Sequence, residues 1–180
     1  MDWWCNLPRR TGLEPNILTI VKLLIVGAPN SGKTTVSREL RESFGLNAVD
    51  MDDEIVRLNN GVWPDINTKN EVVQPKVLEL VMAMPEVVLF NSYMSVERTV
   101  RLRKAGFRIV LLDVSEAELR RRNARRVAEE SWTNIEWFDW HRKNIQELHD
   151  NNLFDYAISG ERDVKSVAAD IARLAKSSDD

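Results

Sequence analysis

The 180-residue sequence has a single cysteine, Cys5, so it cannot form an internal disulfide. One free thiol suits a reducing compartment. The sequence also lacks any apolar run close to the roughly 20 residues that a membrane-spanning helix needs, and the polar stretch after Asp2 lacks the apolar region of a signal peptide. We therefore expect a cytoplasmic protein that has no membrane partner.

An excess of charge of one sign is missing as well. The 25 Lys and Arg residues nearly balance the 28 Asp and Glu residues, for a net charge of −3, so no overall basic field points to nucleic acid. Internal repeats, low-complexity segments and a second-domain linker are absent. We expect a single domain over residues 20–180, preceded by an arm over residues 1–19. The adjacent Trp3 and Trp4 would either pack this arm on the domain or contact a partner.

One motif organises the rest of the chain. It is Gly27-Ala28-Pro29-Asn30-Ser31-Gly32-Lys33-Thr34, which fits the phosphate-binding pattern G-x-x-x-x-G-K-[ST] at every fixed position. The apolar run before it, residues 20–26, is typical of a strand buried on both faces of a parallel sheet. After it, Val36, Leu40 and Phe44 form the apolar stripe of a helix. The alternative is a surface turn followed by an exposed lysine.

The chemistry of this motif is direct. Its backbone N–H groups and the helix N-terminus attract phosphate, so we predict that residues Gly27 to Thr35 bind a nucleoside triphosphate. Lys33 would supply a mobile cation. The hydroxyl of Thr34 would bind Mg²⁺, a hard ion that takes few protein ligands and shares the rest with phosphate and water.

Further strands and helices are expected to alternate along the chain. We expect strands over 46–49, 87–91, 107–114 and 154–159, and helices over 71–84, 96–104 and 164–175, with turns over 59–70. Pro75 would begin or kink its helix. This alternation predicts an α/β fold around a parallel sheet.

Two acids follow the second expected strand. In an extended segment Asp50 and Asp52 project to the same side, at the edge where open α/β sheets bind ligands. One could orient Mg²⁺ through its water, and the other could accept the proton of an acceptor hydroxyl. In the alternative interpretation, Asp52 or Asp53 caps the next helix. Both interpretations can hold.

A helix that starts after Ser115 carries five arginines within seven residues, namely Arg120, Arg121, Arg122, Arg125 and Arg126. Their planar guanidinium groups suit phosphate oxygens, so we predict a phosphate-binding lid around residues 116–133. The alternatives are a plain amphipathic helix and a nucleic-acid patch.

The residues that follow are less informative. Trp137, Trp140, Asn144 and Leu148 share one helical face, which predicts core packing. His141 and His149 have no nearby cysteine or third ligand for a zinc site, and we expect both at the surface.

Together these motifs resemble the small P-loop kinases of the shikimate-kinase, gluconate-kinase and adenylate-kinase type. The resemblance covers about nine-tenths of the chain. It implies a three-layer P-loop NTPase fold, with helices on both faces of a five-stranded parallel sheet in the order 2-3-1-4-5, and it implies the use of ATP and Mg²⁺. The roles that it implies are catalysis for Lys33, Asp52, Arg122 and Arg126, nucleotide binding for Arg125, and metal binding for Thr34 and Asp50.

Two departures from shikimate kinases concern the acceptor. The chain has Asn91-Ser92-Tyr93 where those enzymes carry a glycine-rich turn, and the Arg-Pro pair of their lid is missing beyond Arg126. Shikimate is therefore not the expected acceptor. The proline- and arginine-bearing nucleotide pocket of adenylate kinase is also missing after the third strand.

The sequence thus predicts a kinase that moves the γ-phosphoryl group of ATP to the hydroxyl of a small acceptor. A second hypothesis is a kinase that acts on a polynucleotide, tRNA or nucleotide hydroxyl. A third is a regulator that hydrolyses ATP slowly and signals through a partner. The guanine-reading segment N-K-x-D of switch GTPases is absent. The sequence does not determine the oligomeric state.

Overall fold

The computed structural model describes residues 22–130 and 138–176. The arm over residues 1–19, Trp137, and residues 131–133 of the expected lid lie outside these residues. The described strands are β1 (Lys22–Val26), β2 (Ala48–Asp50), β3 (Val88–Asn91), β4 (Phe107–Asp113) and β5 (Tyr156–Ser159). They form one sheet in the order β2-β3-β1-β4-β5, and every neighbouring pair is parallel. The expected topology is confirmed.

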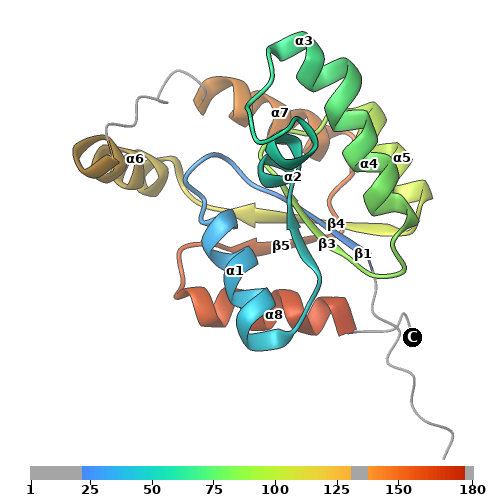
Figure 1. Ribbon diagram of the computed structural model, residues 1–180. Helices are drawn as coiled ribbons and strands as arrows, with labels where there is room; N and C mark the ends of the chain where they lie inside the picture. Colours follow the sequence, from blue (N-terminus) through green and yellow to red (C-terminus); the bar gives the residue numbers. More distant parts are fainter. Residues whose placement is uncertain (1–21, 131–137, 177–180) are drawn as a thin grey trace, which may run out of the picture.

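The central strand β1 explains why its sequence is apolar without alternation. Leu23 and Ile25 belong to one core cluster, whereas Leu24 and Val26 belong to a second cluster on the opposite face. Because helices cover both faces of the sheet, the interior side chains of β1 lie in apolar surroundings on either side, and apolar residues are therefore favoured at every position. This arrangement gives three layers (Figure 1).

The helices divide between the two faces. In Figure 1, α1 (Lys33–Phe44) and α8 (Val164–Lys176) lie side by side below the sheet. Above it lie α2 (Met51–Leu58), α4 (Gln74–Ala83), α5 (Val96–Lys104) and α7 (Phe138–Asp150). The arginine-rich helix α6 (Glu116–Glu130) follows β4 and extends away from the sheet.

The segment between α2 and α4 is more helical than the sequence predicts. A short helix, α3 (Ile66–Thr68), begins after Asp65, whose carboxylate accepts hydrogen bonds from the N–H groups of Asn67 and Thr68. A π-helical turn, η1 (Lys69–Val73), then leads into α4. Pro75 lacks the N–H that a regular helix would donate one turn back, which accounts for the irregular turn before it.

None of the helices within residues 22–130 and 138–176 combines the length and the apolar character that crossing a membrane requires.

Candidate active site

The phosphate loop joins β1 to α1, and its two glycines are needed for different reasons. A side chain on Gly27 would place a Cβ atom 2.7 Å from Ser31 Oγ and 3.1 Å from the carbonyl oxygen of Leu112. Gly32 has a φ of 100°, in a backbone region that side chains disfavour. The first glycine therefore permits close packing and the second permits the turn into α1.

Lys33 bends back over this loop. Its Nζ donates hydrogen bonds to the carbonyl oxygens of Gly27 (2.8 Å) and Ala28 (2.9 Å), and only 8% of the residue is exposed. Burial lowers the pKa of Lys33 to about 8, although the charges of Asp50 and Asp52 act in the opposite direction. A cation so poorly solvated gains from any anion that binds in the loop.

Thr34 and Asp50 form the candidate metal site. The Thr34 hydroxyl donates a hydrogen bond to Asp50 Oδ2 at 3.1 Å, so a hydroxyl and a carboxylate oxygen meet at the edge of the loop. Such hard oxygen ligands fit Mg²⁺. Across the described residues no group of three or more His, Cys, Asp or Glu could hold a metal. This donor set suits an ion that takes its remaining ligands from phosphate and water.

Asp50 and Asp52 are close to Lys33, but not in the way that the sequence predicts. Asp50 ends β2 and caps α2, where its Oδ1 accepts a hydrogen bond from the N–H of Asp52 at 3.1 Å. Asp52 lies in the first helical turn rather than in an extended segment, and its side chain is exposed. Although the residue is exposed, the neighbouring protein partly desolvates its carboxyl group. This desolvation and the charge of Asp50 raise the pKa of Asp52, while the charges of Lys69 and Lys33 lower it.

Two arginines of α6 reach the phosphate loop. Arg122 Nη1 donates to the carbonyl oxygens of Asn30 (3.3 Å) and Ser31 (3.1 Å), and its Nη2 donates to the carbonyl oxygen of Gly160 (2.8 Å). Arg126 Nη1 donates to Asn30 Oδ1 at 2.9 Å. The two residues are four positions apart and therefore share a helical face.

The other arginines of α6 lie on its solvent side. The pairs, all within one turn of the helix, are Arg120 with Glu116 (2.6 Å), Arg121 with Glu118 (2.6 Å) and Arg125 with Glu129 (3.9 Å). With 62% of its side chain exposed, Arg125 is not brought to the loop. Thr35 is likewise exposed, on the first turn of α1.

The histidine of α7 differs from its predicted surface position. His141 is buried, and its Nδ1 lies 2.9 Å from the carbonyl oxygen of Ser92, in the loop after β3. Burial lowers the pKa of His141 to about 4, with smaller contributions in the same direction from the charges of Lys33 and Lys69, although the contact with Ser92 raises it. His141 is therefore a neutral group at ordinary pH, held against the loop that follows β3.

Trp140 also departs from the predicted core position. Its side chain is partly exposed and stacks on Tyr93, with ring centroids 4.0 Å apart. Asn144, one turn further along α7, exchanges hydrogen bonds with the backbone of Met94 and is buried as predicted. Helix α7 thus holds the loop that follows β3.

Sequence reasoning missed Asn123. This residue of α6 is only 2% exposed and accepts a hydrogen bond from Asn30 Nδ2 at 2.9 Å. The sequence feature that indicates its role is its spacing: Asn123 is a polar residue four positions after the buried Leu119, on the same face of the helix. A polar side chain on a buried stripe needs a partner, and here the partner is in the phosphate loop.

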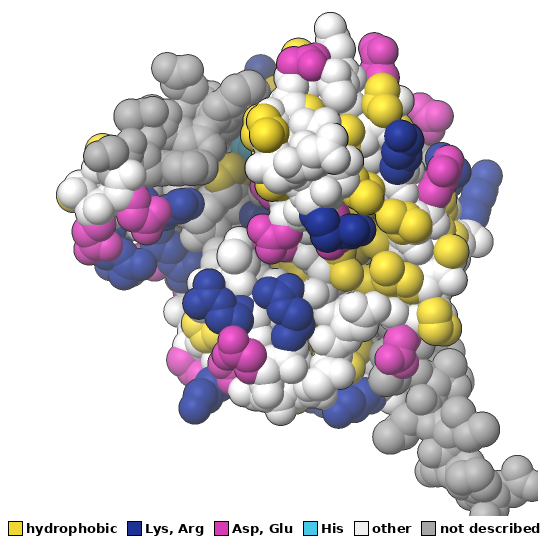
Figure 2. All heavy atoms as spheres, viewed as in Figure 1, with side chains coloured by type: hydrophobic (Ala, Val, Ile, Leu, Met, Phe, Trp, Pro, Cys, Tyr) yellow, Lys and Arg dark blue, Asp and Glu magenta, His cyan; other side chains and the backbone are white. Residues whose placement is uncertain are grey.

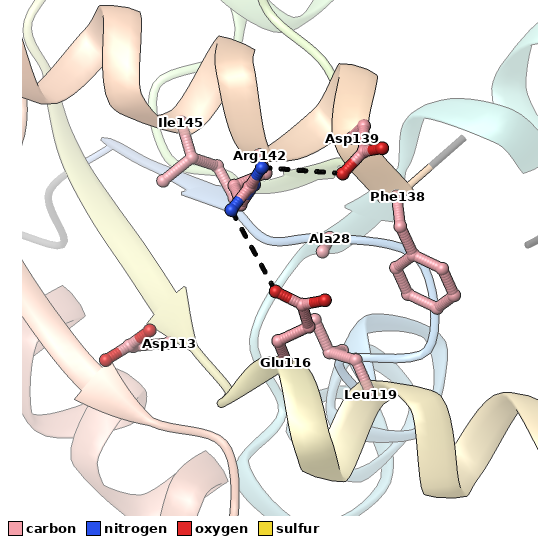
Figure 3. Close-up of a pocket in the computed structure, with 8 residues that line it drawn as sticks. All are labelled: Ala28, Asp113, Glu116, Leu119, Phe138, Asp139, Arg142 and Ile145. Atoms are coloured by element: carbon pink, nitrogen blue, oxygen red, sulfur yellow. Dashed lines mark ion pairs between the residues drawn. The ribbon is translucent and has the colours of Figure 1, made fainter. Parts of the chain in front are cut away.

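A small hollow lies next to Ala28 of the phosphate loop (Figure 3). Its volume is about 140 Å³, and it is lined by Ala28, Asp113, Glu116, Leu119, Phe138, Asp139, Arg142 and Ile145. Arg142 pairs across it with Glu116 at 4.0 Å and with Asp139 at 3.5 Å. An apolar floor with three carboxylates on its rim does not suit phosphate.

Comparisons with known proteins agree with this geometry. The shikimate kinase of Thermobifida fusca (strain YX) is 30% identical over 105 residues, which cover 55% of this chain and 61% of that kinase. Among solved structures, the shikimate kinase of Acinetobacter baumannii, in complex with shikimate, has a TM-score of 0.63 at 23% identity and covers 87% of this chain and 93% of that chain. A gluconokinase of Sinorhizobium meliloti 1021 has a TM-score of 0.57 at 17% identity and covers 87% of this chain and 94% of that chain.

The structural likeness is one of fold, because the identities are low. A family model described as an AAA domain matches residues 23–147, a stretch that runs from β1 into α7 and contains the whole phosphate loop. The resemblance to P-loop kinases indicated by the motifs is thereby confirmed. The chain belongs to the AAA domain family.

Proposed function

We propose that this protein is an ATP- and Mg²⁺-dependent kinase that transfers the γ-phosphoryl group to a hydroxyl of a small-molecule acceptor. The observation that carries the proposal is the meeting of Lys33, Thr34 and two carboxylates, Asp50 and Asp52, at the carboxyl ends of β1 and β2. A phosphate cradle next to paired acids is the arrangement that phosphoryl transfer to a hydroxyl requires.

The donor phosphates would bind to the N–H groups of the loop, and Lys33 would exchange its carbonyl contacts for phosphate oxygens. Thr34 and Asp50 would hold Mg²⁺, and the bound ion would neutralise negative charge on the donor phosphates. The loop is already curled and needs no reorganisation, so its dipoles stabilise the transferred charge at low cost.

Asp52 would accept the proton of the acceptor hydroxyl. The hydroxyl oxygen then bonds to the γ-phosphorus as the bond to the ADP oxygen breaks, so that ADP and a phosphate monoester leave. The raised pKa of Asp52 makes its carboxylate a better base than an ordinary aspartate. Its exposed side chain is accessible to an acceptor that enters from solvent.

The arginine-rich helix supplies the remaining positive charge. Arg122 and Arg126 already contact the loop, so they are the arginines that we assign to the transferred phosphate. The site for the acceptor would be bounded by Asp52, Lys69 and His141, since the charges of Lys33 and Lys69 influence the pKa of both Asp52 and His141.

A nucleic-acid acceptor has less support. All five arginines of α6 pair with glutamates of the same helix, so the cluster presents little net positive charge to a nucleic acid. On the face that Figure 2 presents, Lys and Arg side chains are interspersed with Asp and Glu. We therefore favour a small acceptor over a polynucleotide. The acids beside the phosphate loop, Asp50 and Asp52, favour it over a regulatory ATPase that has no acceptor. We also propose a cytoplasmic location, on the basis of the single cysteine.

The test is a screen of γ-labelled ATP with Mg²⁺ against sugars, sugar acids, nucleosides and oligonucleotides with a 5′-hydroxyl. We expect label transfer to one class of small hydroxyl compound, with no transfer when the acceptor is left out. ATP hydrolysis that is unchanged by every acceptor would favour the regulator. Transfer to oligonucleotides that falls steeply with salt would favour the nucleic-acid hypothesis.

Two variants serve as controls for this screen. Lys33→Ala should lose nearly all turnover and still unfold cooperatively, and turnover that survives would count heavily against the scheme. Asp52→Asn should keep ATP affinity within about twofold while turnover falls by about 10²- to 10⁴-fold, the usual contribution of a general base.

A further inference from the structure

The side chain of Asn30 connects the phosphate loop to α6. Asn30 is a loop residue with a φ of 66°, in the left-handed region that asparagine tolerates better than most residues. Its Nδ2 donates to Asn123 Oδ1 at 2.9 Å, and its Oδ1 accepts from Arg126 Nη1 at 2.9 Å. Since arginine can only donate, the amide orientation of Asn30 is determined by its neighbours.

The connection between Asn30 and α6 depends on the buried side chain of Asn123. The residue is 2% exposed, and a buried amide is costly unless it forms hydrogen bonds. Arg122, its neighbour in α6, donates to the backbone carbonyl oxygens of Asn30 and Ser31. Three residues of one helix therefore hold both the backbone and the side chain of the same loop position.

The chemical nature of Asn30 matters for Arg126. Arg126 also pairs with Glu130 on its own helix, at 2.9 Å. A carboxylate in place of the Asn30 amide would bind the guanidinium group more strongly and would repel phosphate. A neutral amide holds the guanidinium group beside the loop and can release it to a phosphate oxygen at little cost.

From these contacts we infer that Asn30 and Asn123 are positioning residues for phosphoryl transfer. The Asn30 amide places the Arg126 guanidinium beside the terminal phosphate of ATP, and Asn123 orients that amide. The inference rests on the proposed function, because Arg126 would contact the phosphate that is transferred. It predicts that loss of Asn30 affects ATP more than ADP, which lacks that phosphate.

The experiment measures the affinities of Mg²⁺-ATP and Mg²⁺-ADP by calorimetry, without any acceptor. Arg126→Ala should weaken ATP binding by about 10- to 100-fold, the value of a hydrogen bond to a charged group. Asn30→Gly, which keeps the left-handed backbone, should weaken ATP binding by about 3- to 10-fold. ADP affinity should change by less than about twofold in both variants.

Two further variants separate positioning from a structural role. The double variant Asn30→Gly/Arg126→Ala should bind ATP no more than about twofold more weakly than Arg126→Ala alone, because Asn30 acts through that arginine. Asn123→Leu should weaken ATP binding in the same direction as Asn30→Gly. The matched control is Asn152→Gly, at an exposed asparagine with a φ of 52° remote from the loop, and it should bind as the wild type does.

Several results would overturn the inference. They are equal losses for ATP and ADP, additive losses in the double variant, or wild-type affinity in Asn30→Gly. Each of these leaves the proposed kinase intact if the wild type binds ATP. A wild-type chain that binds neither nucleotide overturns the proposed function, and the inference with it. Thermal unfolding of each variant confirms that it is folded.

Discussion

Replacement of Lys33 by methionine tests the electrostatics of the phosphate loop in isolation. Burial lowers the pKa of Lys33 from its ordinary value of 10.5 to about 8. Below pH 8 the amine is protonated in both the folded and the unfolded chain, and above pH 10.5 it is neutral in both. Between these values the unfolded chain binds more protons, so the free energy of unfolding rises with pH.

The magnitude follows from the difference between the two pKa values. At 1.36 kcal/mol per pH unit, the fall from 10.5 to about 8 corresponds to at most about 3 kcal/mol. The Lys33→Met variant lacks this pH-dependent contribution to the free energy of unfolding, because methionine does not titrate. The variant also loses the hydrogen bonds to Gly27 and Ala28. The difference in unfolding free energy, wild type minus variant, should therefore increase by up to that amount between pH 8 and pH 10.5.

The assay is urea unfolding of both proteins at half-unit steps of pH, without nucleotide. The wild type and the variant share all other titrating groups, so the contributions of those groups cancel in the difference between the two unfolding free energies. A difference that stays flat across this range would refute the argument that Lys33 is held in a desolvated position. Mg²⁺-ATP should restore the charged form of Lys33, and with saturating nucleotide the wild type should lose the pH dependence specific to Lys33.

Further predictions concern the packing of the phosphate loop and the buried histidine of α7. Gly27→Ala should lower the free energy of unfolding by about 1–3 kcal/mol, as overpacking does, because the new Cβ would lie 2.7 Å from Ser31 Oγ. Urea unfolding measures this loss of stability. An unchanged midpoint would contradict the close packing at Gly27. The pKa of about 4 for the buried His141 predicts that the free energy of unfolding falls by up to about 3 kcal/mol as the pH drops from 6.5 to 4, since the unfolded chain then binds the extra proton. His141→Gln should remove that part of the acid dependence, and a variant that follows the wild type through this range would disprove it.

The fold was largely predictable because its signals are local. The apolar run of β1, the glycine loop and the amphipathic stripe of α1 follow one another within about 25 residues, and each depends on neighbours in the chain. The strand order came from the resemblance to P-loop kinases rather than from periodicity. The helical turns over residues 66–70 lie where the sequence predicts turns, since they depend on Asp65 and Pro75 rather than on an apolar stripe.

The site was only partly predictable. The sequence identified Lys33, Thr34, Asp50 and Asp52, since each lies within two residues of a strand end or in the motif itself. It could not choose among the arginines of α6, because the rotation of that helix about its axis depends on what the helix packs against.

The amino-acid sequence by itself thus determined the phosphate loop, the alternation of strands and helices, and the presence of acids and arginines near the loop. Only the tertiary structure decided that Arg122 and Arg126 face the loop while Arg125 faces solvent, that Asn123 is a buried partner of Asn30, and that His141 is desolvated. The physical reason is distance along the chain. Backbone conformation responds to adjacent residues, whereas contacts between α6 and a loop some 90 residues earlier exist only once the helices have packed on the sheet.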